Sequence, residues 1–298
     1  MCEMFAPGDS EVQPTRILLE GDPGAGKSTI LQKLAYEWGA GTCGDTCGAR
    51  CIHSFRLVIH LHASALIQQN SFTRAVIDAL LPKDVPVDEE QFQRLLQSDQ
   101  TLILVDAFDE IHDEGKNLVL DFVQGKVLRQ ATAVVSSRPV YLKKMEKHFD
   151  EVFRVMEYST QQLQHYVEKF AECTGLSLHP LLAKIESNEV LDVWHNPLHL
   201  FISCFLISEG HHSANTRTGL YQSLYEFTLK KAAERMQLST EDVERQYMHP
   251  LCELSFTHIF LKKRNKLTKE DFKLLECDPE EVCKVGYMTK EVVLDGIH

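Results

Sequence analysis

The feature that most restricts the fold of this chain is GDPGAGKST at residues 21–29, where three glycines, a lysine and two hydroxyl side chains lie close together. Residues 16–20 before it have the composition of a short buried strand, and residues 28–38 repeat apolar side chains at helical spacing. A glycine-rich turn between a strand and a helix directs backbone N–H groups toward one point, which is also the positive end of the helix dipole. The segment therefore predicts a binding site for an anion.

Within this segment the spacing of Gly21, Gly26, Lys27 and Ser28 fits G-x-x-x-x-G-K-[ST], the phosphate-binding loop known as Walker A. In this motif the lysine reaches the β- and γ-phosphates of a nucleotide, and the following hydroxyl, here Ser28, binds Mg²⁺. We expect Thr29 to add a further phosphate contact. The predicted nucleotide-binding residues of the loop are Gly21, Asp22, Pro23, Gly24, Ala25, Gly26, Lys27, Ser28 and Thr29.

Apolar, β-rich runs recur along the first half of the chain and alternate with helical patterns. They lie at residues 16–20, 55–63, 101–108, 132–139 and 151–156. Alternating strands and helices, with strands that are apolar throughout, are typical of a parallel sheet covered by helices on both faces. The sequence therefore predicts an α/β domain that ends near Glu157.

No further strand pattern follows, and the remaining sequence is predicted to be helical. One helical pattern begins with an N-cap at Ser159 or Thr160 and ends at Gly175, and a second ends at Gly210. Residues 210–219 have the polar composition of a linker. We therefore expect three regions, at residues 1–157, 158–214 and 215–298.

A second acidic motif, LILVDAFDE, places carboxylates at the end of the third predicted strand, where open α/β sheets bind ligands. In proteins with a phosphate-binding loop, an aspartate at the position of Asp106 holds Mg²⁺ through its water shell. Asp109 and Glu110 follow closely enough to orient or deprotonate a water molecule. We therefore predict Asp106 as a metal-binding residue, and Asp109 and Glu110 as catalytic residues.

The order of five motifs extends this interpretation to nearly the whole chain. GDPGAGKST, LILVDAFDE, VVSSRP, STQQLQHYVEKF and WHNPLHL follow one another as in the NACHT nucleoside triphosphatase module of NOD-like receptors, which the chain resembles. The resemblance implies an AAA+-like P-loop sheet with strand order 5-1-4-3-2. It also implies that a small helical domain at residues 158–214 and a winged-helix domain at residues 215–298 follow the nucleotide-binding domain.

Further site residues come from this resemblance. It implies that Arg138, at the tip of the fourth strand, senses the γ-phosphate, which agrees with an arginine placed near two phosphate-binding loops. It also implies that Pro197 packs against the adenine, although a proline there also suits the first position of a helix. Most family members have glycine where this chain has Ala107. The family's later histidine that contacts ADP has no counterpart before residue 298, so the winged helix is expected to be incomplete.

The leading hypothesis is a nucleotide-dependent switch, in which ADP favours a closed form and ATP, bound with Mg²⁺, favours an open and self-associating form. Hydrolysis would be slow. The expected partners are an adenine nucleotide and either further copies of the chain or related signalling proteins. Two alternatives remain open: a phosphotransferase acting on a small substrate, and a scaffold that retains nucleotide without hydrolysing it.

Net charge and cysteine content indicate which partners and which cellular compartment to expect. The formal net charge of −12 argues against nucleic-acid or membrane binding, and nine cysteines in 298 residues are too few and odd in number for a secreted disulfide framework. We therefore expect a cytoplasmic protein. Cys43, Cys47, Cys51 and His53 could hold zinc, but their spacing is unusual for a zinc site and a loop is the simpler interpretation.

Overall fold

The computed structural model describes residues 2–6, 13–41, 51–67, 69–111, 113–139, 141–175, 179–186, 192–211, 214–261, 271–272 and 278–287. These residues form two compact units, and the boundary between the units falls after Met156. Cys43 and Cys47 lie outside the described residues. Each unit is considered by itself below.

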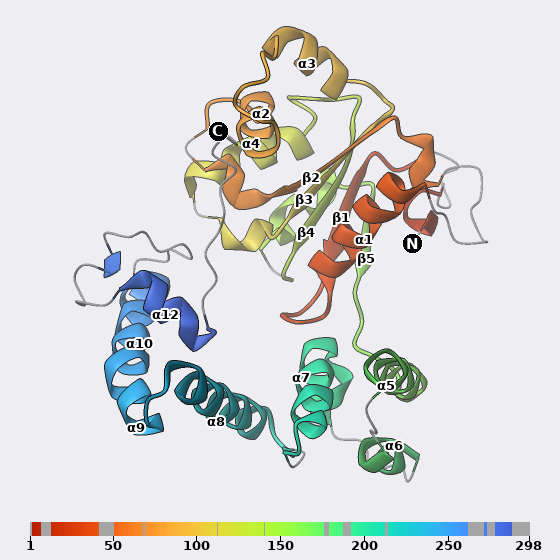
Figure 1. Ribbon diagram of the computed structural model, residues 1–298. Coiled ribbons are helices and arrows are strands. Elements are labelled where there is room, and N and C mark those ends of the chain that lie inside the picture. The colour runs from red at the N-terminus through yellow and green to blue at the C-terminus, as the bar shows by residue number, and fades with distance from the viewer. Residues whose placement is uncertain are drawn as a thin grey trace. The chain divides into compact units, whose positions relative to one another are not determined.

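The first unit is an α/β layer structure (Figure 1). Its elements are η1 (Cys2–Phe5), β1 (Arg16–Glu20), α1 (Lys27–Ala40), η2 (Ile52–Ser54), β2 (Leu57–His62), η3 (Ala63–Leu66), α2 (Phe72–Leu80), α3 (Glu89–Leu96), β3 (Thr101–Asp106), η4 (Phe108–Glu110), α4 (Asp113–Val123), β4 (Thr132–Ser137), η5 (Lys143–His148) and β5 (Glu151–Arg154). All strand pairs are parallel, in the order β2-β3-β4-β1-β5. This arrangement confirms the predicted 5-1-4-3-2 order.

The sheet is apolar on both faces because each face is covered by helices. Strands β1, β3 and β4 are buried along their whole lengths. One face packs against α1 through residues such as Leu31 and Leu34, and the other packs against α2 and α4 through residues such as Val76 and Phe122 (Figure 1). Parallel strands bring their carboxyl ends to the same edge, so the loops after β1, β2, β3 and β4 meet there.

Each predicted strand is present at its expected position, but all except the first are shorter than predicted. β1 has the predicted bounds, whereas β3 ends at Asp106 and β4 ends at Ser137. The third strand stops because Ala107 adopts the left-handed conformation, with φ of 58°, and starts the 3-10 turn η4. The acidic residues of the LILVDAFDE motif therefore begin at Asp106, where strand β3 ends.

The second unit is helical throughout its described residues. Its elements are α5 (Thr160–Thr174), α6 (His179–Glu186), η6 (Asp192–His195), α7 (Pro197–Ser208), α8 (Arg217–Met236), α9 (Thr240–Val243), η7 (Glu244–Met248), α10 (His249–Ser255), η8 (Phe256–Leu261) and α12 (Pro279–Val285). Ser159 caps α5 in a capping box with Gln162, and the Asn196 side chain caps α7 ahead of Pro197. The division at residues 214 and 215, and the winged-helix interpretation, remain predictions.

A histidine in the core of this unit is expected to make the stability of the chain depend on pH. His199 is 5% exposed, and its ring lies edge-on to Tyr221 with 5.7 Å between centroids. Burial and, to a smaller extent, the charge of Arg217 lower the pKa of His199 below its ordinary value of 6.5. The unfolded chain then binds a proton that the folded chain does not, so this contribution to stability is complete above pH 6.5 and falls as the pH drops below it.

We expect the parent chain to lose unfolding free energy between pH 7.5 and pH 5.5, and His199→Gln to lose less over the same interval. Denaturant unfolding followed by circular dichroism at several pH values measures both slopes. The variant serves as its own reference at pH 7.5, where both proteins carry an uncharged side chain at this position. Equal slopes for the two proteins would contradict the role assigned to His199.

Among the described residues, no helix has the length and apolar character needed to span a membrane.

Candidate functional site

Two glycines shape the loop after β1, one through a close packing contact and the other through its backbone conformation. A Cβ atom on Gly21 would lie 3.1 Å from the Cβ atom of Val155, so a larger residue there would have to displace Val155 by a few tenths of an ångström. Gly26 has φ of 100° and forms the N-cap of α1 without a side-chain hydrogen bond to the helix. The first backbone N–H groups of α1 therefore have no side-chain cap, which suits an anion at this helix end.

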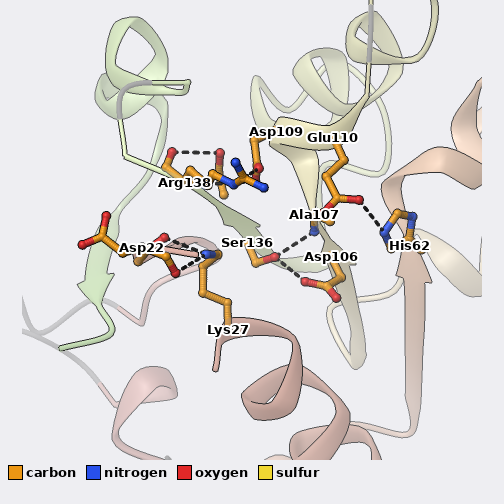
Figure 2. A network of polar contacts seen from close by, with 11 residues as sticks. Asp22, Lys27, His62, Asp106, Ala107, Asp109, Glu110, Ser136 and Arg138 are labelled. Atoms are coloured by element: carbon orange, nitrogen blue, oxygen red, sulfur yellow. Dashed lines mark hydrogen bonds and ion pairs between the residues drawn. The ribbon is translucent and has the colours of Figure 1, made fainter. Parts of the chain in front are cut away.

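Lys27 is the first residue of α1 and folds back over this loop. Its Nζ donates to the carbonyl oxygens of Gly21 at 2.6 Å and Asp22 at 3.1 Å (Figure 2). Burial lowers the pKa of Lys27, while the carboxylates of Asp109 and Asp106 oppose that shift. The ammonium group thus binds the loop carbonyls within electrostatic range of Asp106 and Asp109. Ser28 and Thr29 are exposed on the first turn of α1.

Asp106 is the last residue of β3 and is 5% exposed. The strand register pairs Val105 with Val135, so the next residue of β4, Ser136, lies beside Asp106. The Ser136 hydroxyl donates to Asp106 Oδ1 at 2.5 Å and accepts the N–H of Ala107 at 2.9 Å (Figure 2). One buried hydroxyl therefore fixes both the carboxylate and the turn that follows it.

Ala107 occupies a backbone conformation that glycine adopts without cost. Its φ and ψ are 58° and 49°, which are unfavourable for a residue with a Cβ atom. The hydrogen bond from its N–H to Ser136 helps to hold this conformation. Ala107 thus starts a left-handed turn, after which the side chains of Asp109 and Glu110 point in different directions.

Asp109 and Glu110 are adjacent in sequence but have different surroundings. The Asp109 side chain is 5% exposed, and it accepts the backbone N–H of Arg138 at 3.0 Å and pairs with Arg138 Nε at 2.8 Å. The Glu110 side chain is 41% exposed and points away from Arg138 toward His62, with 3.6 Å between Glu110 Oε2 and His62 Nε2 (Figure 2). Asp109 therefore braces an arginine, and Glu110 presents a carboxylate to solvent.

These residues have the chemistry needed for a magnesium nucleotide. The carboxylate of Asp106 and the hydroxyl of Ser28 are hard oxygen ligands of the kind that Mg²⁺ prefers. The uncapped N-terminus of α1 and the ammonium group of Lys27 provide positive charge for phosphate oxygens. The donor set at this edge of the sheet thus fits both groups.

Comparison with known proteins agrees with this geometry. A family model described as the NACHT domain matches residues 15–173, which are more than half of the chain. The chain belongs to the NACHT domain family. With its P-loop sheet, the NACHT domain is a nucleotide-binding domain.

Proteins similar to this NACHT domain are much longer than the chain. NLR family CARD domain-containing protein 4 of Xenopus tropicalis is 22% identical over 279 residues, covering 92% of this chain and 26% of that protein. Nucleotide-binding oligomerization domain-containing protein 2 of Pan troglodytes is 26% identical over 230 residues, covering 70% and 21%. The chain thus spans about a quarter of the length of these relatives. Among solved structures, the RuvB Holliday junction branch migration motor of Thermotoga maritima has a TM-score of 0.42 and 12% identity, covering 78% of this chain and 77% of that one.

The structure of the NACHT domain brings most of the predicted site residues to one sheet edge and adds two that the sequence did not indicate. The loop at 21–29, Asp106, Asp109, Glu110 and Arg138 lie there together. Pro197 belongs to the second unit, and its contact with adenine remains a prediction. Ser136 and His62 were missed. The signal for both was their place at the carboxyl ends of strands that flank β3.

The cysteine cluster is only partly visible in the described residues. Cys51 is a free thiol, and no group of three or more potential metal-binding side chains is found in the described part of the chain.

Proposed function

We propose that this chain is the nucleotide switch of a signalling protein of the NOD-like receptor type, which binds ATP or ADP with Mg²⁺ and hydrolyses ATP slowly. The observation that carries the proposal is the meeting of four elements at one sheet edge: the loop at 21–29, the Asp106 carboxylate, the Asp109–Arg138 pair and the exposed Glu110 carboxylate. Each has a separate task in binding or cleaving a nucleoside triphosphate.

The phosphate groups would be held by the loop. Its backbone N–H groups and Lys27 would bind the β- and γ-phosphates, with Ser28 and Asp106 on the metal side and Thr29 on the phosphate side. Mg²⁺, when bound, supplies charge neutralisation on the phosphate oxygens. Ser136 keeps the Asp106 carboxylate in one orientation, which favours binding without rearrangement.

We assign separate roles to the two acidic residues of the motif. Glu110 is the residue suited to take a proton from water, because its carboxylate is accessible. Asp109 is buried and engaged by Arg138, so its role is to orient that arginine rather than to move a proton. This division refines the prediction that both residues handle water.

Arg138 is the residue through which the chain would distinguish bound ATP from bound ADP. Its Nε is paired with Asp109, and the γ-phosphate of ATP would compete for the same guanidinium group, whereas ADP offers no oxygen there. A ligand shifts a conformational equilibrium only through such differential contacts. We therefore infer that ATP and ADP favour different states of the chain through Arg138.

Assembly is a further part of the proposal. We propose that the ATP-bound state associates with other copies of the chain or with related signalling proteins in the cytoplasm, without nucleic acid or membrane as a partner. The name of the Pan troglodytes relative, which refers to both nucleotide binding and oligomerization, supports this proposal.

Displacement of a fluorescent ADP analogue tests the choice of base. We expect ATP to displace it at a lower concentration than GTP does, because the family resemblance points to adenine and the chain lacks the complete N-K-x-D element that selects guanine. Identification of any nucleotide that copurifies with the chain is an independent check. Tighter competition by GTP would refute the assignment of adenine.

Phosphate release separates the switch from its alternatives. A switch releases phosphate from ATP in the absence of any acceptor, whereas a phosphotransferase consumes ATP only when its acceptor is added. A scaffold would retain nucleotide that neither exchanges nor is cleaved.

A further inference from the structure

The last residue of β2 lies beside the acidic turn that follows β3. His62 is paired with Asp106 in the parallel ladder between the two strands. From there its ring reaches the Glu110 side chain, with 3.6 Å between Nε2 and Oε2 (Figure 2). His62 and Glu110 belong to different strand-end segments, so the contact exists only because β2 and β3 are neighbours in the sheet.

The ring of His62 is itself held in place by the next turn of the chain. His62 is the N-cap of η3, and its Nδ1 accepts the backbone N–H of Ser64 at 3.2 Å. The Ser64 hydroxyl also lies 2.8 Å from Nδ1. These contacts orient the opposite ring nitrogen toward Glu110.

The same contacts determine where the imidazole proton lies. A ring nitrogen that accepts a backbone N–H through its lone pair does not carry a proton, so the neutral ring of His62 carries its proton on Nε2. This assignment leaves an N–H group facing the Glu110 carboxylate. His62 therefore directs an N–H group toward Glu110 Oε2, at an N···O distance of 3.6 Å, whether the ring is neutral or charged.

We propose that His62 is a positioning residue, which holds the Glu110 carboxylate in the orientation that receives the proton of the attacking water. The proposal rests on the proposed hydrolysis of ATP. In that reaction the water oxygen bonds to the γ-phosphorus, Glu110 takes the proton, and the bond from the γ-phosphorus to the bridging oxygen breaks to release ADP. His62 touches none of the reacting atoms.

Folding stability alone does not account for this contact. The side chains are 43% and 41% exposed, and pairs with such exposure contribute little to the free energy of unfolding. Their removal should therefore leave the fold intact. The consequence should appear in turnover, where a misplaced general base slows the chemical step.

The test is a double-mutant cycle on the full chain, with kcat and KM for ATP measured by phosphate release. We expect His62→Leu to lower kcat by about tenfold and to leave KM within about twofold. His62→Gln, which keeps an N–H donor at a similar reach, should restore most of kcat. In the Glu110→Gln background, His62→Leu should cause no further loss, because the residue through which His62 acts is already disabled.

Three outcomes would overturn the proposal. One is an unchanged kcat in His62→Leu. Another is a tenfold loss that persists in the Glu110→Gln background, which would mean that His62 acts elsewhere. The third is a rise in KM alone, which would indicate a role in nucleotide binding. Failure of the proposed function would be distinguishable, because the parent chain would then release no more phosphate than Lys27→Ala does.

Discussion

Lys27→Ala should abolish the rise in thermal stability that the parent chain shows with Mg-ATP. The substitution removes the cation that would face the β- and γ-phosphates. Among the contacts described for this loop, no other side chain supplies a positive charge at the N-terminus of α1. A ligand that binds only the folded state adds about 2.7 kcal/mol of stability at a hundredfold excess over its dissociation constant. Thermal unfolding with and without Mg-ATP measures this difference directly.

Lys33→Ala is the matched control for this experiment. Lys33 lies on the same helix, its side chain is 58% exposed, and it pairs with Glu37 on the helix surface. Losing this pair should change stability by less than about 0.5 kcal/mol and leave the nucleotide-dependent shift intact. If Lys27→Ala keeps the shift of the parent, the loop does not bind the phosphates and the switch proposal fails.

Glu110→Gln should separate binding from hydrolysis. The amide keeps the size of the side chain and can no longer take a proton, so we expect ATP binding to persist while the rate of phosphate release falls about 100-fold. Stabilisation by Mg-ATP should be retained. Since ATP would then remain uncleaved, light scattering should report more self-association than in the parent chain.

Asp109→Asn provides the contrast. Its side chain is buried against Arg138, so the loss of charge should lower the thermal stability of the nucleotide-free chain, which Glu110→Gln should not do. If Glu110→Gln released phosphate at the rate of the parent while Asp109→Asn stopped release without lowering stability, the two assigned roles would have to be exchanged.

The sequence predicted the parts of this site that depend on local chemistry. Gly21, Gly26 and Lys27 were recognisable because a phosphate-binding turn requires glycine conformations and a cation at a fixed spacing. The buried strands were recognisable because both of their faces are apolar. The strand order came from the family resemblance rather than from the residues.

The remaining features depend on spatial neighbours and turn geometry. Adjacent carboxylates such as Asp109 and Glu110 look equivalent in a sequence, and the 3-10 turn after Ala107 is what separates them. His62 belongs to none of the motifs recognised in the sequence, because its contact with Glu110 depends on the pairing of β2 with β3. The π-helical turns η7 and η8 in the second unit likewise have no local signature in the sequence.

The hydroxyl of Ser136 has a mechanical consequence. It connects Asp106 and Ala107, at the end of β3, to β4, and just beyond the end of β4 the backbone N–H and side chain of Arg138 are bonded to Asp109. The ends of β3 and β4 are thus connected by two sets of side-chain contacts beyond Val105 and Val135, their last paired residues. We expect the two strand ends to move as one rigid body. In the proposed switch, a shift of Arg138 toward the γ-phosphate would therefore also shift the Asp106 carboxylate.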